Sequence, residues 1–295
     1  MLVYFRLAAA ILPAALLLLL VYKRDKNGKE PKDLLWRLIF AGGIIIIPIY
    51  IYELVGQLVI EFGNAVLTGG LELGFAANFF VYFGVVAFAE EGFKMIALAT
   101  QTWKNPNFNF KYDGIVYAVF VGMGFAIFEN IKYVLEYGLG TGVLRALTAI
   151  PGHCAFAIIM GTFYGSSKYF QSIKNKKMQV ICMFYAIVIP IVGHGLYDFA
   201  LTVSNSALSI VVSIIYMIIL DIFALVLLLY QSKHDQYILG TKKPIPQNQA
   251  QQPRMNMQPG APMYNGYINA TEYSSYINPT NVVPNMYNPT DFRRQ

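Results

Sequence analysis

The sequence predicts an all-α fold, a polytopic transmembrane helical bundle of about seven spans that ends in a disordered C-terminal tail. Hydrophobic residues make up 56% of the 295 positions and charged residues only 13%. Soluble domains carry about a quarter charged residues, so this chain has too few charges to cover a water-facing surface. Several apolar runs also exceed the roughly 18 residues that identify a membrane-crossing helix. These observations argue against a soluble fold.

The net charge of +6 does not indicate a nucleic-acid partner. The basic residues lie in short hydrophilic gaps between apolar runs, as expected for loops that face the cytoplasm and anionic lipid. No basic stripe with interleaved aromatic residues is present. The two cysteines, Cys154 and Cys182, fall inside apolar segments and are expected to be buried free thiols. The predicted surroundings are therefore the lipid bilayer, with no nucleic acid.

Seven apolar runs are candidate membrane spans. The first differs from a signal peptide, because its charges (Lys23, Arg24 and Lys26) follow the apolar run and no small-residue cleavage site comes after Leu20. It is therefore expected to remain as an anchor. The predicted spans are 3–22, 34–55, 76–100, 113–133, 142–165, 179–203 and 206–230.

The lysine and arginine residues predict the orientation. Of the 22 basic residues, 18 lie in four hydrophilic segments that fall on alternate ends of successive spans. The opposite ends carry only Arg6, Lys132 and Arg145. The positive-inside rule then predicts a multi-pass protein of the cell membrane with its N-terminus outside and its C-terminus in the cytoplasm. The four basic segments are 23–37, 101–112, 166–178 and the chain after residue 230.

The chain is expected to divide into three regions. Residues 1–33 form an N-terminal anchor span with a basic cytoplasmic loop, residues 34–232 form the helical core, and residues 233–295 form a cytoplasmic tail. From Pro244 onward the chain holds eight prolines among many Gln, Asn, Tyr and Met residues. Such a segment cannot bury enough apolar surface to offset its ordering entropy, so the tail is predicted to be disordered.

The third span contains two adjacent carboxylates and a lysine. An ionisable side chain at the bilayer centre costs about 2.5–3.5 kcal/mol on insertion scales, so each one needs a partner or a purpose. Lys94 follows Glu90 and Glu91 by four and three residues, which brings the three side chains to one helix face. Lys94 can neutralise one carboxylate and leave the other as a general base. A purely architectural ion pair is the alternative, but it does not need the second glutamate.

The fourth and fifth spans each add a weaker signal. Glu129 lies near the end of the fourth span, and Asn130 supplies a neutral donor and acceptor beside it. An interfacial glutamate is the alternative interpretation. In the fifth span His153 follows Pro151 and Gly152, where a freed backbone carbonyl and a close helix approach are expected. A lone buried histidine is usually satisfied locally, so His153 carries little weight alone.

The sixth span pairs a histidine with an aspartate. His194 and Asp198 are four residues apart on one helix face, and Gly193 and Gly195 clear space around the imidazole. The carboxylate can orient the ring and fix its tautomer, or both groups can bind a metal. A hydrogen bond that only packs helices is the alternative.

The combination of these residues is more specific than any one of them, because groups on four consecutive spans can converge only if the helices surround a polar cavity. A carboxylate and two imidazoles are what the activation of water for peptide hydrolysis requires. One group removes a proton from the water, and the others hold the scissile carbonyl or bind a metal that does so. Glu53 and Asp221 lack such neighbours and are interpreted as structural.

The ordered motifs resemble those of a known family. EExxK (Glu90 to Lys94), FxxxEN (Phe125 to Asn130) and HxxxD (His194 to Asp198) look like the motifs of PrsW intramembrane proteases, over roughly residues 34–230. That family is similar in turn to the CAAX prenyl endopeptidases and their bacterial immunity-type relatives. Lysine at position 94 and the asparagine after Glu129 favour the PrsW family.

The resemblance implies an activity and a set of site residues. The implied activity is cleavage of a membrane-anchored anti-sigma factor near its extracytoplasmic side, which starts regulated intramembrane proteolysis. The implied partner is therefore a membrane-anchored protein substrate. The implied site residues are Glu90, Glu91, Lys94, Glu129, Asn130, His153, His194 and Asp198.

Two mechanisms and one different class of function stay open. Glu90 or Glu91 polarises a water while His153 and His194 bind the oxyanion without a metal, or the two histidines hold zinc together with Glu91 or Asp198. No contiguous HExxH motif occurs, and the metal-free form is favoured over the zinc-dependent, CAAX-type form. A proton-coupled small transporter is the other class, which predicts internal repeats. None is recognisable in the sequence.

Overall fold

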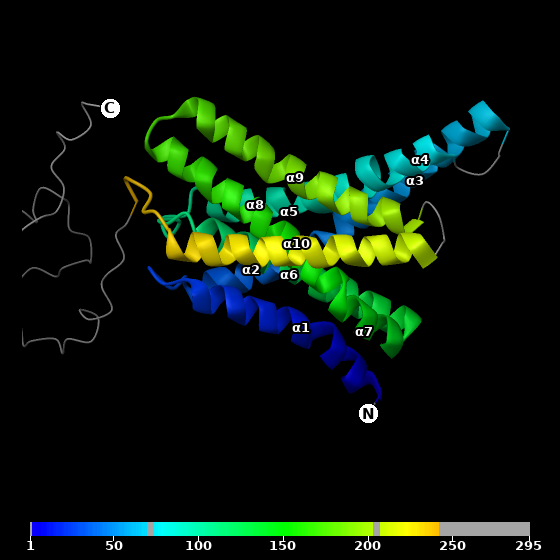
Figure 1. Cartoon of the computed structure of the whole chain (residues 1–295), viewed down its shortest axis with the longest axis horizontal. Helices are drawn as coiled ribbons and strands as arrows, with labels where there is room; N and C mark the ends of the chain where they lie inside the picture. The colour runs from blue at the N-terminus through cyan, green and yellow to red at the C-terminus, as the bar shows by residue number, and fades with distance from the viewer. Residues whose placement is uncertain (1, 70–73, 203–206, 242–295) are drawn as a thin grey trace, which may run out of the picture. The chain divides into compact units, whose positions relative to one another are not determined.

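The computed structural model describes residues 2–69, 74–202 and 207–241, and these residues fold into helices joined by short loops (Figure 1). Within them, the one β-type pairing is an isolated bridge between Phe110 and Tyr237. The prediction of an all-α fold is confirmed. The elements are α1 (Leu2–Arg24), α2 (Lys32–Ile44), α3 (Ile46–Thr68), α4 (Phe75–Phe79), the π-helix η1 (Phe80–Ala87), α5 (Phe88–Thr102), α6 (Asp113–Tyr137), α7 (Leu139–Leu147), α8 (Ala149–Ser172), α9 (Lys176–Thr202) and α10 (Ala207–Lys233).

Six helical stretches in the described part of the chain are long and apolar enough to cross a membrane. The remaining predicted span, 76–100, corresponds to α4, η1 and α5, which follow one another without a break from Phe75 to Thr102. At about 1.5 Å per residue, this rod is roughly 40 Å long and also suffices to cross the hydrocarbon layer. The prediction of about seven helical spans is confirmed.

Two predicted spans have different boundaries in the structure. The second continues past residue 55, because α3 begins at Ile46, directly after the end of α2, and runs on to Thr68. The fifth is divided at Thr148, whose φ of −124° and ψ of −71° separate α7 from α8. Pro151 therefore lies in the first turn of α8, where the missing N–H costs no helical hydrogen bond, and not inside a long helix as predicted.

α6 is the central helix of the bundle. Of its apolar segment 83% is buried, against 17% for α1 and α10, and it packs against α1, α2 and α8. A Cβ at Gly124 of α6 would lie 2.2 Å from the Ile39 carbonyl oxygen of α2. A Cβ at Gly165 of α8 would lie 2.1 Å from the Lys111 carbonyl oxygen. Glycine thus permits these close contacts, which hold α2, α6 and α8 in a fixed arrangement.

Two residues separate the end of the π-helix η1 from the glutamate pair. Segments of this kind are rare and occur frequently at functional sites. The Tyr52 hydroxyl of α3 donates to the Gly84 carbonyl oxygen of η1 at 3.3 Å. Because α9 packs against both α5 and α8, the helices that carry the glutamates and the two histidines are neighbours (Figure 1).

One end of the bundle, here called the basic end, consists of the loops 25–31, 103–112 and 173–175 and the segment 234–241. The Ile238 N–H donates to the Asn109 carbonyl oxygen at 2.7 Å, and the Ile238 side chain is buried. The prediction that the disordered tail begins at residue 233 is therefore wrong for residues 234–241, because they bury an apolar side chain and pair with the loop before α6. The rest of the predicted tail, 242–295, lies outside the described residues.

Candidate active site

The side chains of the eight predicted site residues meet in one place, contributed by α5, α6, α8 and α9. All of them are buried except Asp198, whose side chain is 22% exposed. The bundle thus brings together the motifs that are separated by up to about a hundred residues in the sequence. The residues are Glu90, Glu91 and Lys94 on α5, Glu129 and Asn130 on α6, His153 on α8, and His194 and Asp198 on α9.

Lys94 forms the centre of this cluster. Its Nζ donates to Glu90 Oε2 at 3.1 Å and to Glu91 Oε1 at 2.8 Å, and it lies 3.2 Å from His153 Nδ1. The ammonium also lies 4.3 Å from the centre of the Phe125 ring, which gives the first residue of the FxxxEN motif a cation–π contact. One buried cation therefore compensates two buried carboxylates.

His194 lies between two carboxylates. Its Nδ1 is 3.0 Å from Glu91 Oε1 and its Nε2 is 3.3 Å from Asp198 Oδ2. An ionised carboxylate only accepts hydrogen bonds, so both ring nitrogens are placed to donate, as in an imidazolium. The ring stacks on Phe156 with 5.2 Å between centroids and 15° between planes, which fixes its orientation.

His153 has a different hydrogen-bonding pattern. Its Nδ1 faces the Lys94 ammonium, which can only donate, so Nδ1 is the acceptor. Its Nε2 lies 3.0 Å from Glu129 Oε2 and donates to that carboxylate. This pattern assigns a neutral ring with its proton on Nε2.

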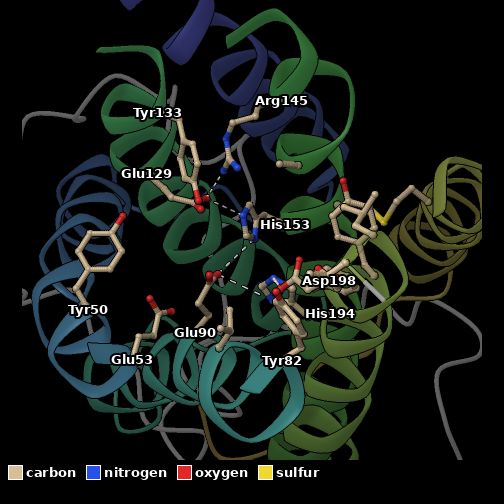
Figure 2. A pocket seen from close by; sticks show the side chains of 18 of the residues that line it. Tyr50, Glu53, Tyr82, Glu90, Glu129, Tyr133, Arg145, His153, His194 and Asp198 are labelled. Carbon is tan, nitrogen blue, oxygen red and sulfur yellow. Dashed lines mark hydrogen bonds and ion pairs between the residues drawn. The ribbon is translucent and has the colours of Figure 1, made fainter. Parts of the chain in front are cut away.

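Arg145 was not predicted as a site residue, yet it completes the cluster. From α7, its Nη2 donates to Glu129 Oε2 at 2.5 Å and its Nε donates to Asn130 Oδ1 at 3.2 Å. Figure 2 shows the resulting line of contacts from Arg145 through Glu129 and His153 toward Glu90. The only signal in the sequence was that Arg145 is one of three basic residues at the ends opposite the basic loops.

A cavity of about 290 Å³ opens beside the cluster (Figure 2). Of the glutamate pair, Glu90 lines the cavity and Glu91 does not. Among the described residues, no hydrogen bond engages Glu90 Oε1, and Glu90 Oε2 lies 4.0 Å from His153 Nδ1 and 3.9 Å from His194 Nδ1. Glu53 also lines the cavity, a position that the sequence did not indicate. The other lining side chains that the sequence did not indicate include Tyr50, Tyr82 and Tyr133.

The donor set of the cluster fits a divalent metal ion in its chemistry. Glu90, Glu91, His153 and His194 each offer a ligand atom, and these atoms lie within 4.8 Å of one another. Carboxylates and imidazoles are the usual ligands of catalytic zinc. The group includes both glutamates, whereas Asp198, one of the predicted alternatives, is not part of it. The Lys94 ammonium lies against three of the four ligands, so an ion at their centre requires this side chain to move away.

These features define a class of protein. A helical bundle that spans the membrane and gathers carboxylates, imidazoles and a buried cation at an internal cavity has the parts of an intramembrane hydrolase that activates water.

Comparison with known proteins identifies the family. The profile of the PrsW family intramembrane metalloproteases matches residues 30–227. A Protease PrsW of Clostridioides difficile (strain 630) is 32% identical over 215 residues, which cover 72% of this chain and 84% of the relative. The Protease PrsW of Bacillus subtilis (strain 168) is 33% identical over 196 residues, with coverages of 66% and 82%. No solved structure matches the chain. The chain belongs to the PrsW family and is an intramembrane protease.

Proposed function

We propose that the protein cleaves a peptide bond of a membrane-anchored regulatory protein, of the anti-sigma-factor kind, with a water molecule that Glu90 activates. The observation that carries the proposal is the position of Glu90. It lines the cavity, and both imidazoles lie about 4 Å from its Oε2. Glu91 is turned away from the cavity and is engaged by Lys94 and His194, which suits it to hold these two groups in place.

In this mechanism Glu90 takes a proton from a water in the cavity, and the resulting hydroxide attacks the scissile carbonyl carbon. The carbonyl oxygen becomes an oxyanion, which the positive charge of the His194 imidazolium stabilises from the cavity wall. Glu90 then returns the proton to the departing amine as the C–N bond breaks. Lys94 favours the ionised form of Glu90 and Glu91, and Asp198 orients the His194 ring.

A zinc-dependent version uses the same residues differently. Glu90, Glu91, His153 and His194 would hold the ion, and a bound zinc would supply Lewis-acid activation of water. The position of Lys94 favours the metal-free version, because its ammonium already supplies the positive charge among these ligands.

The predicted orientation supports a substrate bond near the extracytoplasmic surface. Counted at about 1.5 Å per residue from the basic end, Glu90, His153 and His194 lie roughly 18–28 Å into the bundle. The hydrocarbon layer is about 30 Å thick, so the cavity lies in the half away from the basic end. If the basic end faces the cytoplasm, as the positive-inside rule predicts, the cavity is close to the outer surface.

The test is a proteolysis assay of the detergent-purified protein with a single-pass anti-sigma-factor-like substrate. We expect Glu90→Gln, Glu91→Gln and His194→Ala to lower cleavage by roughly a hundredfold to ten-thousandfold, the range of general-base losses, while membrane insertion is retained. Exhaustive chelation is expected to leave activity unchanged.

Three results would contradict parts of this proposal. Loss of activity on chelation, with recovery on addition of zinc, would replace the metal-free mechanism by the zinc-dependent one. Full activity of Glu90→Gln would show that Glu90 is not the general base. Intact proteolysis by a variant that carries all three substitutions, together with loss of proton-coupled flux in liposomes, would favour the transporter.

A further inference from the structure

We propose that Arg145 is a positioning residue of the protease, which holds Glu129 so that Glu129 fixes the orientation and tautomer of His153 beside Glu90. The inference rests on the proposed function, because it assigns Arg145 a part in the same hydrolysis. It concerns a residue on α7, a separate short helix that packs against α1, α6 and α8.

The contacts of Arg145 converge on one stretch of α6. Its Nη2 reaches Glu129, its Nε reaches Asn130, and its guanidinium carbon lies 3.9 Å from the centre of the Tyr133 ring. A planar guanidinium can make these three contacts at once, with two edge hydrogen bonds and one stacked face, whereas a lysine ammonium cannot. The contacts thus fix both polar residues of the FxxxEN motif relative to α7.

Glu129 depends on Arg145 for its charge balance. Glu129 is buried, with 7% of its surface exposed, and a buried carboxylate without a cation is strongly disfavoured. Lys94 is already hydrogen bonded to Glu90 and Glu91. Among the described residues, Arg145 is the one cation that forms an ion pair with Glu129, because the His153 ring that also contacts this carboxylate is neutral.

The same oxygen of Glu129 connects Arg145 to the reaction centre. Glu129 Oε2 accepts from Arg145 Nη2 and lies 3.0 Å from His153 Nε2. With this oxygen held in place, His153 keeps its proton on Nε2 and turns Nδ1 toward Lys94 and Glu90. Removal of Arg145 frees Glu129 to rotate or to bind a proton, and His153 then loses the partner that fixes its ring. Arg145 acts through two intervening side chains and need not touch the substrate.

The experiment measures kcat and KM separately for Arg145→Met, Arg145→Lys, Glu129→Gln and the Arg145→Met/Glu129→Gln double variant, with the single-pass model substrate used above. We expect Arg145→Met to lower kcat roughly 10–100-fold, as is typical when an orienting partner is removed, with KM changed by less than about threefold. Arg145→Lys should fall between wild type and Arg145→Met, because it keeps the charge and loses one of the two edge bonds. In the Glu129→Gln background, Arg145→Met should lower kcat by no more than about threefold further, because residues that act as a unit are not additive.

Arg37 provides a matched control, since it is an exposed arginine paired with Asp33 far from the cavity. Arg37→Met should leave both constants unchanged.

A rise in KM with unchanged kcat for Arg145→Met would overturn the proposal and make Arg145 a substrate-binding residue. Independent, multiplicative losses in the double variant would also overturn it. If Arg145→Met does not fold, wild-type activity of Arg145→Lys would still contradict the proposal that the two hydrogen bonds from the guanidinium edge hold Glu129 and Asn130. A wild-type protein that cleaves no substrate would instead refute the proposed function.

Discussion

Two buried groups of acidic residues in this protein are balanced in opposite ways. In the active site, each buried glutamate has a cation or an imidazole as partner, through Lys94, Arg145 and the two histidines. At the basic end, Asp25, Glu30 and Asp113 form a second group, here called the basic-end cluster, which is equally buried. Within the described residues, no ion pair reaches any of these three carboxyl groups.

The basic-end cluster is held by neutral donors and by protonation. The Tyr117 hydroxyl donates to Glu30 at 2.5 Å, and two backbone N–H groups of the preceding loop donate to Asp113. The nearby Lys29 ammonium donates to backbone carbonyl oxygens. Burial raises the pKa of Asp25 to about 6 and the pKa of Glu30 to about 8, because desolvation disfavours the ionised form.

The comparison teaches that burial alone does not identify a working carboxylate. In the active site, the cations favour the ionised form of the acidic groups, which is the form able to accept a proton. At the basic end, burial favours the protonated form of the acids, which serve to join loops. The partners of a buried acid, and not its depth, separate the two roles.

The largest expected effect comes from removing the central cation of the active site. Lys94→Met leaves two buried carboxylates with one imidazolium, so we expect the free energy of unfolding to fall by about 3–5 kcal/mol and proteolysis to be lost. Denaturation in mixed detergent micelles, followed by tryptophan fluorescence, measures the change. The exposed Lys104→Met is the control and should stay within about 0.5 kcal/mol of wild type. Equal stability of the two variants would show that the glutamates are not ionised and that the two clusters do not differ.

An intermediate effect is expected at Asp198, which touches the site from its edge. Asp198→Asn keeps the shape but removes the charge next to His194 Nε2, so kcat should fall roughly 10–100-fold while the fold stays intact. Asp221 offers a matched control, because it is another intramembrane aspartate but does not line the cavity. If Asp221→Asn lowered kcat as much as Asp198→Asn, the loss would reflect any aspartate within the membrane and not the orientation of His194.

The residues that repeat at helical spacing were the predictable part of the site. Glu90, Glu91 and Lys94 share a face because their spacing fixes it, and His194 and Asp198 do so for the same reason. Which glutamate faces the cavity depends on how α5 is rotated against α9, and spacing within one helix does not determine that. Arg145 could not be predicted, because its contact with Glu129 depends on the break at Thr148 that ends α7.

The basic-end cluster was hidden for a related reason. Asp25 and Glu30 lie in the segment 23–37, which carries six basic residues, and such a segment is expected to be solvated. The structure buries both residues under the loop before α6 and the start of the tail, where Asp235 accepts from the Tyr112 N–H at 2.9 Å. Contacts between loops that are distant in sequence leave no periodic signal, so composition predicted a solvated loop and a disordered segment where the chain is packed.

The smallest expected effect concerns Glu30 of the basic-end cluster and the pH dependence of the free energy of unfolding. Because the pKa of Glu30 rises from 4.5 to about 8 on folding, the folded state binds its proton more tightly than the unfolded state. Its stabilising contribution is therefore complete below pH 4.5 and is lost as the pH rises toward about 8.

Glu30→Gln stays neutral and still accepts from Tyr117. Its free energy of unfolding should therefore match that of wild type near pH 4.5 and exceed that of wild type by about 1–3 kcal/mol at pH 8. Denaturation curves across this range measure the difference, and the exposed Glu61→Gln should leave the wild-type slope unchanged. A Glu30→Gln variant that was less stable than wild type at pH 8 would mean that Glu30 is ionised and paired in the folded protein, and the contrast between the two clusters would disappear.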